Sequence, residues 1–250
     1  MPLNYNGNTP AAVTYNVNPV SEVTYNGVTV WQAAPASAAS EFDIFTESAN
    51  QEVVLTYTQS AANAITVDWG DGSPTESPSV LVDYLIHEYA TSGNYTILID
   101  VASGETWSPG GNISGTTYGM FETTGYLTRV LGRSGMTLSA TNAFRNETAL
   151  LSVVIPSGTA TIPRITFDGC YSLISMEWGD DVANIRAGNF TGCTALQNFT
   201  FRTLTPPSIG STTLDGLPVT CNIYVPSSAV ATYQAAQYWS ARAAYIQAIP

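Results

Sequence analysis

The residue types that most often perform chemistry are scarce in this chain. His87 is the one histidine among 250 residues, so neither a multi-histidine metal site nor an ordinary serine–histidine–aspartate set has further candidates. His87 alone would have to act as the base in any such reaction. We therefore predict that the protein is not an enzyme, with no catalytic residues, no cofactor and no bound metal.

Two acidic clusters offer the oxygen ligands that calcium prefers. Asp68 and Asp71 form the first, and Glu177, Asp180 and Asp181 form the second. Neither cluster has the spacing of a recognised calcium loop, and no pair of carboxylates is singled out for glycoside hydrolysis. We expect solvated turns at both clusters, and calcium binding and a carbohydrate-active enzyme are the alternatives.

Three cysteines, Cys170, Cys193 and Cys221, are too few for a disulfide framework. Cys170 and Cys193 are 23 residues apart and occupy equivalent places in a repeat described below. Strands in adjacent coils lie about 4.8 Å apart, so a disulfide between these two is one alternative. We expect instead that all three are buried thiols that behave as small apolar side chains.

Composition and charge exclude several classes of protein. The chain is 44% hydrophobic and only 10% charged despite a net charge of −12, which excludes a disordered acidic chain. All seven basic residues are arginine, and they form no basic stripe, so we expect no nucleic-acid binding. The opening residues carry neither a basic nor an apolar signal region, and the apolar runs are strand-sized. We expect no export signal and no membrane association.

In residues 1–31 a Tyr-Asn pair recurs every ten residues, and Val-Thr precedes the second and third pairs. Alternating Val-Thr-Tyr predicts short strands, and Asn-Gly predicts tight turns. Such strands are too small to fold alone, so they either extend the edge of the next domain or pair with another chain. The stretch Val23–Trp31 resembles the N-terminal segments of phage tail and virion proteins. The resemblance implies a particle-docking arm that uses Tyr5, Asn6, Tyr15, Tyr25, Asn26 and Trp31.

A linker is expected at residues 32–40, followed by a β-sandwich at 41–103. Its strand-like runs cover residues 42–46, 52–58, 64–69, 80–89 and 95–101. The order of its signature residues resembles the PKD family of immunoglobulin-like domains: Trp69, Asp71 and Gly72, then His87 and Tyr89. That resemblance implies packing and turn roles for all five, with His87 near a strand end.

A second linker is expected at 104–112, and residues 113–208 then repeat every 23 residues. Apolar columns at one fixed period predict stacked coils, which form a solenoid. The segments that begin at Phe167 and Phe190 share the FxGCxxL pattern and resemble BspA-type leucine-rich repeats. The two earlier repeats lack Gly-Cys and are degenerate. The leading column of the repeat consists of Phe121, Phe144, Phe167 and Phe190.

Residues 209–250 depart from the repeat, and we expect them to cap the open end of the array. Asn222–Pro226 reads as a final strand. Ser227 or Ser228 is expected to N-cap a helix to about Ala244, with Val230, Tyr233 and Ala236 on one face.

Together these features predict a mainly β, non-enzymatic virion surface protein of a bacteriophage, placed as a capsid decoration or on the tail or fibre. Its arm would bind other virion proteins, and its outer domains would adhere to host glycan, mucus or a host surface protein. A homo-oligomer is compatible with this arrangement. The alternative is a secreted or cell-surface bacterial adhesin with leucine-rich repeats.

Overall fold

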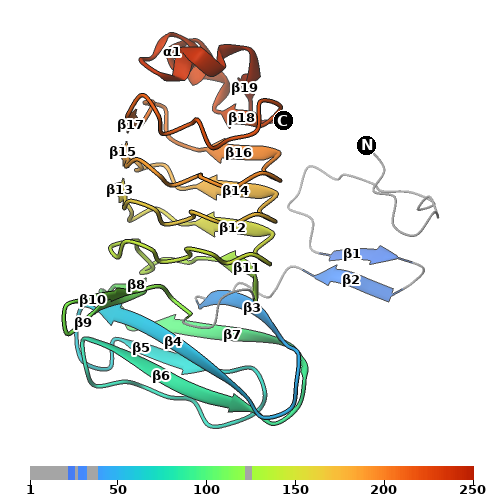
Figure 1. Ribbon diagram of the computed structural model, residues 1–250, viewed down its shortest axis with the longest axis vertical. Helices are drawn as coiled ribbons and strands as arrows, with labels where there is room; N and C mark the ends of the chain where they lie inside the picture. The colour runs from blue at the N-terminus through green and yellow to red at the C-terminus, as the bar shows by residue number, and fades with distance from the viewer. Residues whose placement is uncertain (1–21, 26–27, 33–38, 122–125) are drawn as a thin grey trace. The chain divides into compact units, whose positions relative to one another are not determined.

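The computed structural model describes residues 22–25, 28–32, 39–121 and 126–250. The chain divides into two compact units, Met1–Ser37 and Ala38–Pro250. In the first unit, β1 (Glu22–Tyr25) and β2 (Val28–Gln32) form an antiparallel hairpin (Figure 1). Tyr25 and Trp31 lie in these two strands, whereas Tyr5, Asn6, Tyr15 and Asn26 lie outside the described residues.

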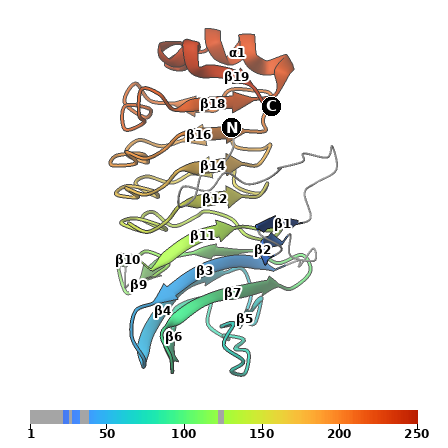
Figure 2. The same ribbon diagram turned by 90° about the vertical axis from the view of Figure 1, so that its right-hand side faces the viewer.

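Residues 39–121, which we call the two-sheet region, place short antiparallel strands in two layers (Figures 1 and 2). Inward-facing positions alternate with exposed ones along the strands because successive side chains point to opposite faces. Phe42 and Trp107 from opposite layers meet edge to face at 5.6 Å. One layer contains β3 (Ser40–Thr46), β7 (Gly93–Val101) and β5 (Ile65–Asp68); the other contains β6 (Val82–Tyr89), β4 (Gln51–Gln59) and β8 (Trp107–Pro109).

Residues 104–112, expected as a linker, carry β8 and the start of β9 (Gly111–Ile113). β9 pairs with β10 (Thr116–Tyr118) in a small hairpin. β8 pairs with β4, and Trp107 is only 1% exposed. Burial of this large indole explains why the segment joins the core. The expected linker at 32–40 likewise begins with the last residue of β2 and ends with the first residue of β3.

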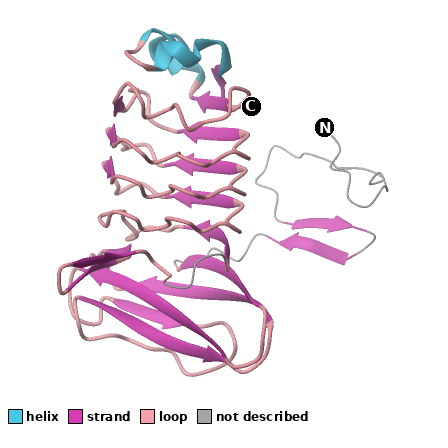
Figure 3. Ribbon diagram, viewed as in Figure 1, coloured by secondary structure: helices cyan, strands magenta, loops and turns pink. Residues whose placement is uncertain are grey.

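Residues 126–225, which we call the coil stack, repeat one coil after another (Figures 1 and 3). Each coil contributes a longer strand to one parallel sheet, and three coils also contribute a short strand to a second. The longer strands are β11 (Leu127–Leu131), β12 (Ser152–Ile155), β14 (Ser175–Trp178), β16 (Asn198–Phe201) and β18 (Asn222–Val225); the short ones are β13 (Thr161–Ile162), β15 (Asn184–Ile185) and β17 (Ser208–Ile209).

The 23-residue columns face inward in this stack. Phe144, Phe167 and Phe190 are at most 1% exposed and lie in one apolar core. The rings of Phe144 and Phe167 stack with centroids 5.4 Å apart. Phe121 is also buried, but its backbone bridges to Leu55 of β4 instead of continuing a regular coil. Its repeat, which lacks Gly-Cys, therefore serves as the junction with the two-sheet region.

The two-sheet region and the coil stack share a sheet. β11 pairs in parallel with β12 on one side and antiparallel with β3 on the other, so nine strands follow one another from β19 (Ile246–Ala248) to β5. Across this junction Arg129 binds buried Glu41, with Nη2 and Oε2 2.9 Å apart, and also binds Asp43. The opposite layer also bonds to the coil stack, because the backbone N–H of Trp107 donates to the carbonyl of Gly135. The first coil therefore has no open edge.

The C-terminal residues cover the other end, although not as one helix. Ser227–Ala229 and Trp239–Tyr245 are 3₁₀ turns that flank the six-residue helix α1 (Val230–Ala235), and β19 (Ile246–Ala248) adds a last parallel strand. The helix ends at Ala235 because Ala236 is extended, with a ψ of 150°, and Tyr238 then adopts a left-handed φ of 66°. This break turns Trp239 inward, where it packs 5.2 Å from the ring of Phe201 and donates its indole N–H to Pro207.

The predicted apolar face of the helix is present, but the predicted serine cap is not. Tyr233 is fully buried, and Val230 and Ala236 pack beside it against the core. Ala229 occupies the N-cap of α1 and makes no side-chain cap bond. Burial of the Tyr233 face therefore fixes where the helix lies, without a capping hydroxyl.

Candidate functional site

The predicted signature residues of the two-sheet region come together beside the turn that follows β5. The indole of Trp69 stacks on the His87 ring at 4.6 Å with the planes 7° apart, and the Tyr89 ring meets His87 edge-on at 4.7 Å. The Tyr89 hydroxyl donates to the Trp69 carbonyl at 2.8 Å, and the Trp69 indole donates to Glu76 at 2.6 Å. Every polar group named here is already bonded within the cluster.

Asp71 closes this cluster from the solvent side. Its Oδ2 lies 2.8 Å from Nε2 of His87, and its Oδ1 accepts the Ser73 N–H. Burial of the carboxyl favours the protonated form, but the bonds from Ser73 and His87 outweigh it and lower the pKa of Asp71 from an ordinary 3.8 to about 2. Gly72 follows with a φ of +84°, as a turn here requires. The arrangement braces a turn, and the His87 ring is held by Trp69, Tyr89 and Asp71.

Replacing Asp71 by asparagine is expected to destabilise the fold at neutral pH and to matter less in acid. The pKa of Asp71 is lower in the folded chain than in the unfolded one, so its charge stabilises the fold fully above about pH 4 and progressively less down to about pH 2. Urea unfolding followed by tryptophan fluorescence at pH 7, 4, 3 and 2 measures the difference between the two proteins. A difference of equal size at pH 7 and pH 2 would contradict the assignment.

The three cysteines are free, buried thiols. The thiol of Cys170 donates to the Phe144 carbonyl at 3.1 Å, and that of Cys193 donates to the Phe167 carbonyl at 3.2 Å. Burial raises the pKa of Cys193 to about 12 and that of Cys221 to about 11. Each thiol of the repeat thus satisfies a carbonyl of the preceding coil and is poorly suited to act as a nucleophile.

The acidic clusters serve local bonds. Asp68 accepts the Gly70 N–H at 2.9 Å, and Glu177 pairs with Arg202. Asp180 accepts the Ser157 hydroxyl and Asp181 accepts the Gly158 N–H at 2.6 Å, so both link one coil to the previous one. In the part of the chain that the structure describes, no three histidine, cysteine or acidic side chains are grouped to hold a metal ion.

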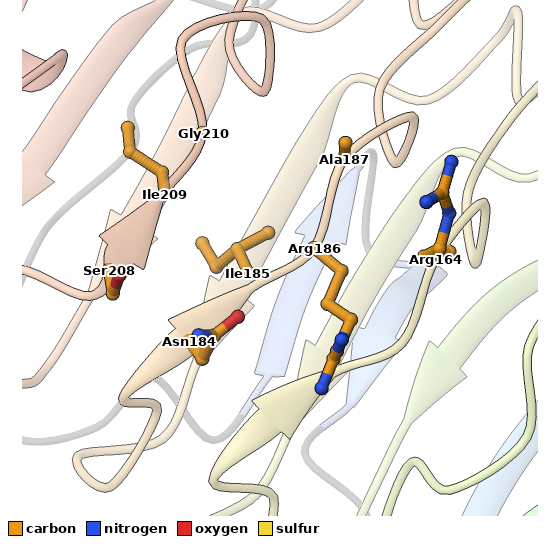
Figure 4. Close-up of a pocket in the computed structure, with 8 residues that line it drawn as sticks. All are labelled: Arg164, Asn184, Ile185, Arg186, Ala187, Ser208, Ile209 and Gly210. Carbon is orange, nitrogen blue, oxygen red and sulfur yellow. The ribbon is translucent and has the colours of Figure 1, made fainter.

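An open pocket of about 270 Å³ lies over the short strands of the coil stack (Figure 4). Asn184 of β15 and Ser208 of β17 are paired neighbours in this sheet and form one side of the pocket. Buried Ile185 and Ile209 underlie it. The remaining lining residues are Arg164, Arg186, Ala187 and Gly210.

The two pocket arginines differ from the other five in the chain. Arg164 and Arg186 are exposed, and neither forms an ion pair within the described residues. Four other arginines are paired with carboxylates, and Arg242 donates to the carbonyls of Leu214, Leu217 and Pro218. The paired arginines are Arg129, Arg133, Arg145 and Arg202.

Sequence reasoning did not identify this pocket. One signal was available: Arg164 and Arg186 each follow closely on an isoleucine of the 23-residue column, Ile162 and Ile185. The two arginines are 22 residues apart, one short of the period, so they occupy adjacent columns of neighbouring coils, and both line the pocket. An anionic ligand group is the partner that such unpaired guanidinium groups favour.

A protein-family model described as BspA type leucine rich repeat region matches residues 117–238, in six copies. No curated protein matches the chain. The match extends past residue 208, the expected end of the repeats, because β18 continues the sheet in register with β16. No helix among the described residues is long and apolar enough to cross a membrane. Residues 117–238 thus carry a BspA-type leucine-rich repeat region, which indicates a protein of the surface or adhesion type.

Proposed function

We propose that this chain is a non-enzymatic virion surface protein of a bacteriophage, which attaches to the particle through residues 1–31 and presents the rest of the chain for adhesion. The site of attachment would be the capsid surface or the tail or fibre. The adhesion partner would be a host glycan, mucus or a host surface protein. No cofactor is required for this role.

The observation that carries the proposal is the nine-stranded sheet that runs from β5 to β19. We infer that the two-sheet region is a PKD-like immunoglobulin sandwich and that the coil stack is a leucine-rich-repeat solenoid with a cap at its C-terminal end. One sheet through both would hold their exposed loops in fixed positions. Loops on such a scaffold suit recognition.

The division of the chain into two compact units supports docking through residues 1–31. The described part of Met1–Ser37 is one hairpin, and this segment is a unit separate from Ala38–Pro250. An isolated two-stranded hairpin is marginally stable in water. Pairing of its edges with strands of another virion protein, or of a second copy, would complete its hydrogen bonding.

Deletion of residues 1–31 tests the proposal. We expect the shortened chain to fold, as judged by an unchanged circular dichroism spectrum, but to be absent from purified particles analysed by mass spectrometry. The matched control is the full-length Arg202→Ala variant, which changes an exposed side chain of the coil stack and should be incorporated normally. Incorporation of the shortened chain at the full-length level would disprove docking. Recovery of the full-length protein from the bacterial surface or medium, and not from particles, would favour the bacterial adhesin.

A further inference from the structure

We propose that the pocket over β13, β15 and β17 binds the carboxylate of an acidic sugar, such as a uronic or sialic acid, with Arg164 and Arg186 supplying the charge. This inference deepens the proposed function, on which it rests, by naming the class of glycan. Unpaired positive charge and free hydrogen-bonding side chains lie together at this pocket.

The charge argument begins with the composition. The chain has a net charge of −12, so an arginine here has many carboxylates available as partners. Arg164 and Arg186 nevertheless form no ion pair among the described residues, and both are exposed. A guanidinium group forms its strongest hydrogen bonds with carboxylates. A ligand carboxylate would meet these groups without displacing a protein partner.

The neighbouring side chains add groups that recognise hydroxyls. Asn184 and Ser208 are directly paired on adjacent strands, and such strands lie about 4.8 Å apart. Neither side chain makes a hydrogen bond within the described residues, although the backbone N–H of each bonds to the preceding coil. An amide and a hydroxyl at that spacing can donate to and accept from the hydroxyls of one sugar ring.

The shape of the pocket also fits a sugar. Ala187 and Gly210 line it with the smallest side chains available, which leaves room for a ring. Ile185 and Ile209 are at least nine-tenths buried, so little apolar surface is offered to a lipid. Figure 4 shows the two arginine side chains extending from the ends of neighbouring coils, in different directions. Both side chains line the pocket, so each offers a guanidinium group to an anionic ligand.

The net charge of the whole chain favours a ligand with one acidic group over a polyanion. At physiological ionic strength charges act over about 8 Å. A polyanion that runs along the surface would meet the excess negative charge of the chain, whereas a single carboxylate would meet chiefly the two arginines. A sugar with one acidic group therefore fits better than a nucleic acid or a heavily sulfated chain.

Methyl glucuronide and methyl glucoside form the test pair, because the glucuronide has a carboxylate where the glucoside has a hydroxymethyl group. Each is titrated into the full-length protein, and amide shifts are followed by NMR. We expect the glucuronide to shift the pocket amides and to bind at least tenfold more tightly than the glucoside. Methyl sialoside should behave like the glucuronide.

The Arg164→Ala/Arg186→Ala double variant should weaken glucuronide binding at least tenfold, and Arg202→Ala should leave it unchanged, because Arg202 lies outside the pocket and is paired with Glu177. Equal binding of glucuronide and glucoside would overturn the inference, as would an equal loss in both variants. Acetate binding as tight as that of the glucuronide would also overturn it, since the ring would contribute nothing. Particles that carry the double variant and still adhere to host glycans would refute only this pocket. Particles that carry the unchanged protein and do not adhere would refute the proposed function.

Discussion

Replacing Asn189 by alanine is expected to destabilise the chain by about 4 kcal/mol, since each buried polar group left unpaired costs about 1–3 kcal/mol. Asn189 is fully buried in the coil stack. Its amide group donates to the carbonyls of Pro163 and Arg186 at 2.7 and 2.6 Å, and its Oδ1 accepts the Thr166 N–H at 2.8 Å. Alanine leaves the Arg186 carbonyl and the Thr166 N–H without that partner, whereas the Pro163 carbonyl keeps its bond from the Thr166 hydroxyl. Equilibrium urea unfolding measures the change.

Asn184→Ala is the matched control, because Asn184 is half-buried in the same coil and its side chain makes no hydrogen bond among the described residues. Its effect should stay within about 0.5 kcal/mol, as for most surface changes. Since Asn189 holds the carbonyl of Arg186 and that of the residue before Arg164, its loss should also weaken sugar-acid binding by the pocket. A loss of stability no greater for Asn189→Ala than for Asn184→Ala would contradict this role.

Replacing Trp178 by alanine is expected to destabilise the chain by about 3–5 kcal/mol, the usual range for a large buried aromatic. Trp178 is fully buried where successive coils meet. Its ring lies 5.7 Å from that of Phe167, 6.1 Å from that of Phe199 and 6.4 Å from that of Phe201. Alanine would leave a cavity between these three aromatic rings. Thermal unfolding and urea unfolding both report the loss.

Trp178→Phe separates packing from hydrogen bonding. The indole N–H of Trp178 is buried and has no hydrogen-bond partner among the residues that the structure describes, so phenylalanine removes an unsatisfied donor while it keeps one aromatic ring. We expect it to destabilise the chain by less than half as much as alanine does. At Trp239 the indole N–H bonds to the Pro207 carbonyl, so Trp239→Phe should be the more damaging of the two phenylalanine variants. The reverse order would show that the indole bond contributes little.

The periodic elements of the fold could be predicted from the sequence because their signals are local. Phe144, Phe167 and Phe190 recur at one stride, and a coil that shelters its neighbour requires such recurrence. The five strand-like runs of residues 41–103 also correspond to β3 to β7, since alternation of apolar and polar residues reports which face is buried.

The strict 23-residue period ends before the sheet does. Phe199 pairs with Ile223, a step of 24, whereas Met176 and Phe199 are separated by 23. One extra residue in the last coil shifts Ile223 out of the column. A strict period therefore ends at residue 208, although the sheet continues through β18 and β19.

The remaining features depend on contacts between distant residues. No pattern in Leu127–Leu131 indicates that β11 pairs antiparallel with β3, which lies some 85 residues earlier in the chain. The helix ends at Ala235 and Ala236, and alanine is a good helix former, so no residue type signals the break. The site was missed for the same reason, because the absence of a carboxylate near Arg164 and Arg186 is visible only once the coils are stacked.

Hydrogen exchange at the junction of β3 and β11 tests the central claim most directly, namely that one sheet makes the two-sheet region and the coil stack a single cooperative unit. Amides of β3 and β11 are expected to exchange only through global unfolding, with the same free energy of opening as amides of β14 and β16. Exchange of the β3 and β11 amides at a clearly lower free energy, while β14 and β16 stay protected, would contradict the account.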